Sequence, residues 1–111
     1  MGYSVRVTTS AHDSVLSSVG YIAEVCFAPH AAARLLREYE STLVALRDNP
    51  TFCPVSLAAS RQLGRRIFRK SISRYFLYFY VDEEADEVVV FSFLHRKHDA
   101  LAHLPHDYGE A

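Results

Sequence analysis

Hydrophobic and polar residues alternate near the start of the chain. Residues 3–8 carry Tyr or Val at odd positions and Ser, Arg or Thr at even positions. A period of two residues is typical of a strand with one buried face. Ser10 and Asp13 follow with the spacing of a helix N-cap and a first-turn acid. We therefore expect a strand over residues 3–8 and a helix that begins at Ser10.

Two apolar stripes with helical spacing come next. The first consists of Val15, Val19, Ile22 and Cys26. Residues 27–29 interrupt it, and Pro29 suits the first position of a second helix because its missing N–H would be unpaired there anyway. A second stripe runs over residues 32–46 until Asn49-Pro50 ends it. Two helices of roughly 16 and 20 residues are therefore predicted to form an antiparallel hairpin.

The second half of the chain is predicted to form mainly strands. Residues 51–60 have no regular pattern and are expected to be a loop. Strands are predicted over residues 65–70, 75–81 and 88–94, and a short helix within residues 96–104. Short turns join antiparallel neighbours, and the hairpin must cover one sheet face to bury its stripes. We expect an α+β fold of two layers, with an antiparallel sheet under the hairpin and the order β-α-α-β-β-β.

Composition and charge narrow the class of protein. A chain of 111 residues, 50% hydrophobic and 23% charged, is typical of one globular domain, here residues 1–111. It has neither an apolar run of about 20 residues nor a signal-peptide pattern, so a cytoplasmic location is expected. Although the net charge is only −1, six of the twelve basic residues fall within residues 61–74, and an acidic run follows at residues 82–87. We expect these two patches to lie apart.

Four landmarks carry a family resemblance. They are Tyr21-Ile22-Ala23-Glu24 in the first predicted helix, Gly64-Arg65-Arg66 before the second strand, residues 75–82, and Phe93-Leu94-His95-Arg96 at the end of the last strand. In this order they resemble RelE/ParE toxins, the growth-arresting halves of type II toxin–antitoxin pairs. The resemblance implies a cognate antitoxin as partner. It also implies one of two targets, since RelE-like members cleave mRNA on the ribosome and ParE-like members inhibit DNA gyrase.

The groups that RelE-like enzymes use are only partly matched. Those enzymes have an arginine directly after the third-strand tyrosine, another past the fourth strand, and a tyrosine in the C-terminal segment. Here Phe76 follows Tyr75, Arg96 matches the second arginine, and Ala102 lies where the tyrosine is expected. A net charge of −1 is also unusual for a protein that binds phosphate-rich RNA. The resemblance therefore favours a ParE-like gyrase inhibitor.

The alternative is a ribosome-dependent mRNA endoribonuclease. Its candidate catalytic residues are Arg96, His95, His98 and Arg65, which would replace the missing cation and acid. His95, His98, His103 and His106 also have a spacing that suggests metal binding, but the chain has no paired-cysteine motif. No metal, cofactor or membrane partner is expected. A small-molecule ligand is not expected either, since the four glycines do not cluster.

Candidate residues for binding the target or the antitoxin come from two patterns. The basic ones are Arg65, Arg66, Arg69, Lys70 and Arg74, although charge on a solvated strand edge would also explain them. The aromatic ones are Phe76, Tyr78 and Tyr80, which alternate with residues 75, 77, 79 and 81. If the odd positions pack under the hairpin, the even positions lie on an open face. Such an apolar face predicts a partner that covers it.

Overall fold

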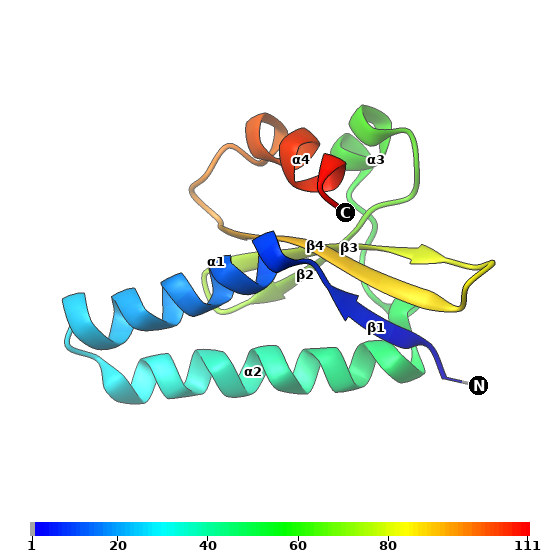
Figure 1. Ribbon diagram of the computed structural model, residues 1–111. Coiled ribbons are helices and arrows are strands. Elements are labelled where there is room, and N and C mark those ends of the chain that lie inside the picture. Colours follow the sequence, from blue (N-terminus) through cyan, green and yellow to red (C-terminus); the bar gives the residue numbers. More distant parts are fainter. Residues whose placement is uncertain (1) are drawn as a thin grey trace.

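The computed structural model describes residues 2–111 and has the predicted α+β class (Figure 1). The elements are β1 (Ser4–Val7), α1 (Thr9–Gly20), α2 (Pro29–Asp48), α3 (Leu57–Leu63), β2 (Phe68–Ile72), β3 (Tyr75–Asp82), β4 (Glu87–His95) and α4 (Ala100–Gly109). A π-helical turn, Tyr21–Val25, extends α1, and a 3₁₀ turn, Pro50–Phe52, follows α2.

The helical hairpin forms as the apolar stripes predict. Pro29 is the first residue of α2, and Pro50 follows its last turn. The N-cap of α1 is Thr8 rather than Ser10, because the Thr8 hydroxyl accepts a hydrogen bond from the Ala11 N–H at 3.2 Å. The predicted cap was therefore wrong by two residues. Either hydroxyl residue can serve as a cap. Because β1 ends at Val7 and α1 begins at Thr9, Thr8 is at the cap position.

The sheet has the strand order β1-β4-β3-β2. Strands β2, β3 and β4 form antiparallel pairs, as expected for strands joined by tight turns. Strand β1 pairs in parallel with β4, so the prediction of a purely antiparallel sheet was wrong for this pair. Because β1 connects to the other strands only through the helices, no tight turn dictates its direction. β1 and β2 are the two edges of the sheet.

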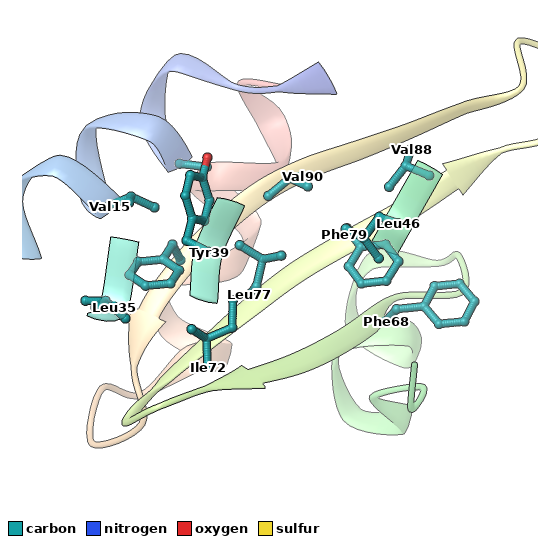
Figure 2. Close-up of a cluster of buried hydrophobic side chains, with 12 residues drawn as sticks. Val15, Leu35, Tyr39, Leu46, Phe68, Ile72, Leu77, Phe79, Val88 and Val90 are labelled. Atoms are coloured by element: carbon teal, nitrogen blue, oxygen red, sulfur yellow. The ribbon is translucent and has the colours of Figure 1, made fainter. Parts of the chain in front are cut away.

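One face of the sheet packs against the helical hairpin (Figure 2). Val15, Leu35 and Leu46 from the helices meet Leu77 and Phe79 from β3, and all five side chains are buried. Phe68 of β2 stacks on Phe79 with 5.2 Å between ring centroids. The odd positions of β3 therefore face the hairpin, as the alternation predicts.

The other face is covered by α3 and α4, which Figure 1 shows across the sheet from the hairpin. Tyr78 and Tyr80 are only 3% and 9% exposed beneath these helices. The expectation of an open face that needs a partner was therefore wrong. The fold has helices on both faces rather than two layers, and the chain supplies this second cover itself.

Both covering helices differ from the sequence-based expectation. Helix α3 begins within the predicted loop and ends three residues beyond it. Ser56 caps it, since its hydroxyl accepts from the Ala59 N–H at 3.3 Å, and Gly64 at φ 73° ends it. Helix α4 continues past Pro105, which was expected to follow the helix. Strand β2 begins at Phe68, three residues later than predicted, because residues 65–67 connect it to α3. Among residues 2–111, no helix combines the length and apolarity that a bilayer crossing requires.

Candidate functional site

The basic run follows the edge of the sheet. Arg69 and Lys70 belong to β2, the edge strand, and Arg74 lies in the turn between β2 and β3. Arg65 and Arg66 precede the strand and share a cavity of about 350 Å³ with Glu83. The predicted separation of basic and acidic patches therefore fails at this end of the sheet. At the other end, around Arg74, the basic residues lie away from the acidic run.

Arg65 has a structural role in addition to any binding role. Its Nη2 donates a hydrogen bond to the Val81 carbonyl at 3.3 Å, and its guanidinium lies 3.8 Å from the centroid of the Tyr80 ring. These contacts fasten the segment between α3 and β2 onto β3. Arg66, the next residue, is exposed.

Phe76 occupies the position where RelE-like enzymes have an arginine. Its ring is half-buried, and the Arg69 guanidinium lies 4.3 Å from the ring centroid. Burial raises the pKa of the neighbouring Tyr78 phenol, while a hydrogen bond and the charge of Arg69 act in the opposite direction. Arg69 therefore covers an aromatic pair, and its guanidinium lies beside the position of the missing arginine.

A second group of polar residues lies where β3 begins and β4 ends. Tyr75 is paired with His95 across the two strands, and their ring centroids are 5.2 Å apart. His98 lies 6.3 Å from His95 by the same measure, and the Arg96 N–H donates to the Arg74 carbonyl at 2.8 Å. Burial lowers the pKa of His95, with further lowering by the nearby charges of His98, Lys97, Arg96 and Arg74. Both effects favour the neutral imidazole of His95.

A cavity of about 910 Å³ opens beside this group. Tyr75, His95 and His98 line one side of it, and Asp13 lies on the opposite wall. That wall also contains four serines of α1, Ser10, Ser14, Ser17 and Ser18. None of these serines was predicted as a site residue, and Ser10 was expected only as a helix cap. Their spacing of three and four residues places them on one helix face, and this periodicity was the signal available.

The four residues of the alternative catalytic set do not form one site. His95, Arg96 and His98 lie together, whereas Arg65 contacts Val81 at the opposite end of β3. Tyr75 and Val81 are separated by roughly 20 Å of extended strand. Within residues 2–111, no cluster of three or more His, Cys, Asp or Glu side chains has a geometry that could hold a metal ion.

The described elements define a class of protein: a RelE/ParE-type α+β fold, with a mixed sheet between a helical hairpin and two short helices. A sequence profile described as "ParE toxin of type II toxin-antitoxin system, parDE" matches residues 5–100. The chain belongs to this family of toxins, and the family implies an antitoxin partner. A search of curated proteins finds no matching sequence.

Proposed function

We propose that this toxin arrests growth by binding DNA gyrase and that an antitoxin silences it by covering its surface. The family match supports a ParE-type toxin, and the observation that carries the choice of target is the half-buried Phe76. Cleavage of RNA requires cations next to the negatively charged transition state. The Phe76 ring itself supplies none, and the Arg69 guanidinium beside it stacks on the ring. The proposed mechanism is therefore occupancy of a protein target, without bond cleavage.

The C-terminal tyrosine supports the same conclusion. Tyr108, the tyrosine of the C-terminal segment, packs into the second core, with ring centroids 5.6 Å from Tyr80 and 5.5 Å from Phe91. A phenol fixed in this way holds α4 on the sheet and is not placed to protonate a leaving oxygen. Ala102, at the position expected for a catalytic tyrosine, is exposed and has no acid–base group.

The direct test is a supercoiling assay with purified gyrase, relaxed plasmid and ATP. Increasing amounts of toxin should stop the conversion to supercoiled plasmid, and prior addition of the cognate antitoxin should restore it. In cells, induction of the toxin should reduce DNA synthesis before protein synthesis, as followed by pulse labelling. Gyrase that supercoils at its full rate in excess toxin would refute the proposal.

A ribosome-dependent endoribonuclease is the second candidate, and the cavity beside Tyr75, His95 and His98 favours it. A neutral His95 can accept the proton of a ribose 2′-hydroxyl, and Arg96 can offset phosphate charge. The test is primer extension on mRNA from translating ribosomes. Replacement of His95, Arg96 and His98 by alanine should abolish cleavage, whereas His106→Ala, an exposed histidine of α4, should not. Cleavage that survives the triple replacement would rule out this site.

A further inference from the structure

The cavity beside the ends of β3 and β4 has the size of a site for a small molecule. Its volume of about 910 Å³ lies in the range of roughly 300–1,000 Å³ that is usual for such sites. On the α1 side its lining extends from Thr9 to Tyr21, a length of roughly 18 Å at about 1.5 Å per residue. The cavity is therefore large enough for a ligand with several linked rings.

The cavity exists because β1 is shorter than β4. Strand β1 pairs with residues 87–90, and the Thr8 N–H donates to the Val90 carbonyl at 2.9 Å where the chain enters α1. Among the described residues, the rest of β4 has no strand beside it on this side. Ser14 and Ser17 of α1 line the resulting space, and within residues 2–111 their hydroxyls take part in no hydrogen bond. Both hydroxyls are therefore available to a ligand.

Aromatic rings form part of the wall. Tyr75 stacks on Phe93, with 4.8 Å between ring centroids and 9° between ring planes, and lies edge-on to His95. Because Phe93 is buried, this stack is anchored in the core. Tyr75 itself is only half-buried, and Tyr21 of α1 is exposed where it lines the same cavity. The planar ring of a ligand can stack on such surfaces.

The walls offer one fixed donor and one free acceptor. His95 Nδ1 accepts a hydrogen bond from the Lys97 N–H at 3.1 Å, so the neutral imidazole carries its proton on Nε2 and is a donor there. In this tautomer His95 is better suited to hold a ligand than to remove a proton. On the opposite wall, Asp13 has no Lys, Arg or His nitrogen within 4.0 Å in the described part of the chain. Its carboxylate is free to accept.

The charges around the cavity select against ions. The lining that residues 2–111 provide includes Asp13 and Glu110 but no Lys or Arg, so an anion inside would be repelled without compensation. At the other end, Arg96 and further positive neighbours lower the pKa of His95, and the same field opposes an organic cation beside it. An uncharged ring with polar edges meets neither penalty.

We infer that this cavity binds a free nucleoside with a guanine-type base. The base stacks on Tyr75, its N1–H and exocyclic amino group donate to the Asp13 carboxylate, and its O6 or N7 accepts from His95 Nε2. Guanine suits these walls because it carries adjacent donors on one edge and the acceptors O6 and N7 on the neighbouring edge. The ribose hydroxyls pair with those of Ser14 and Ser17.

This inference departs from the sequence-based expectation that no small molecule binds. That expectation rested on the missing glycine-rich loop, which is a signal for phosphate binding, and an uncharged base does not need one. The site also lies apart from a position that RelE-like enzymes use for catalysis. Phe76, at that position, packs among the residues beneath α3 and α4, whereas Tyr75 faces the hairpin side.

The inference assigns no reaction and does not depend on the target of the toxin. A failed supercoiling assay would leave it standing, and a failed nucleoside titration would leave the gyrase proposal standing.

The test uses the full ¹⁵N-labelled chain and guanosine, and follows binding by two-dimensional NMR. Guanosine should shift the amide signals of Ser14, Ser17 and His95 with a Kd below about 1 mM. Inosine lacks the exocyclic amino group and should bind roughly fivefold more weakly, because one hydrogen bond to Asp13 is lost. Absence of these shifts near the solubility limit of guanosine would overturn the inference.

The role of the carboxylate is tested by a conservative replacement. Asp13→Asn exchanges one acceptor oxygen for a donor and should weaken guanosine binding by roughly tenfold or more. Its matched control is Asp48→Asn, which makes the same change at an exposed position in the last turn of α2, outside the cavity, and should bind as wild type does. Asp13 is also exposed, so the variant should fold. Equal affinities of the two variants would overturn the assigned site.

Competition distinguishes a free nucleoside from other occupants. A single-stranded oligonucleotide presents the same bases, but its phosphates need cations that the lining lacks, so it should not displace guanosine. Spermidine, an organic cation, should not displace guanosine either. Displacement by the oligonucleotide at a lower concentration of bases, or shifts by spermidine that depend on Asp13, would overturn the inference and assign the cavity to nucleic acid or to a cation.

Discussion

The two faces of the sheet are covered in different ways. On one face, α1 and α2 contribute long apolar stripes, and Val15 and Leu46 are completely or almost completely buried. On the other face, α3 has seven residues and α4 has ten. Only Ala59 of α3 and Leu104 of α4 are buried there, and polar contacts provide part of the attachment.

The polar contacts of the second face are specific. The Ser92 hydroxyl donates to Asp107 Oδ2 at 2.7 Å, and the Gln62 side-chain amide donates to the Leu101 carbonyl at 2.6 Å, linking α3 to α4. Pro105 also removes one hydrogen-bond donor from within α4. We therefore expect the layer of α3 and α4 to open at a lower free energy than the hairpin.

The largest expected effect comes from the hairpin face. Phe79→Ala removes a fully buried ring that stacks on Phe68, and should reduce the free energy of unfolding by about 3–5 kcal/mol in urea denaturation. The control is Phe52→Ala, since Phe52 is 85% exposed and should matter by less than about 0.5 kcal/mol. Similar losses for both variants would contradict the arrangement of this core.

Leu104→Ala tests the second face. Leu104 is fully buried, so its truncation should cost about 2–3 kcal/mol, near the lower end for such changes, because a short helix at the surface can adjust. Amide exchange should accelerate in α3 and α4 but not in α1 or α2. Leu101→Ala in the same helix, where the side chain is 46% exposed, serves as the control. Equal acceleration in the hairpin would show that the two layers open together.

Asp107→Ala should have a smaller effect. It leaves the Ser92 hydroxyl, which is 1% exposed, without its acceptor and should destabilise the protein by about 1–2 kcal/mol. The double variant with Ser92→Ala should lose less than the sum of the two single losses, because both remove the same bond. Asp99→Ala, at an exposed position without a side-chain cap bond, is the control. Strict additivity would exclude this bond as a source of stability.

The smallest effect is a pH dependence at the rim between the faces. The pKa of His95 is lowered in the folded state by burial and by the positive charges of its neighbours. The unfolded chain therefore binds more protons, so stability should rise with pH up to about 6.5 and decline below it. His95→Gln should flatten this part of the profile of Tm against pH. An unchanged profile for His95→Gln would show that other groups cause the pH dependence of stability.

Local patterns account for the parts of the structure that were predicted. The hairpin and the three antiparallel strands follow from periods of 3.6 and two residues, and from short turns between strands. The aromatic residue at position 76 and the basic run along β2 can likewise be recognised from the sequence. Such features depend only on residues a few positions apart in the sequence. They can therefore be predicted from the sequence alone.

The remaining features needed the tertiary structure. Alternation showed that Tyr78 and Tyr80 share a face, but not that α3 and α4 cover it. Arg34 and Lys70 are 36 positions apart, and only the packing of α2 beside β2 brings both to one groove. The direction of β1 also depends on the path of the hairpin. Sequence by itself determined which side of each element is apolar. Tertiary structure decided what lies against that side, because the choice depends on the free energy of contacts between distant segments.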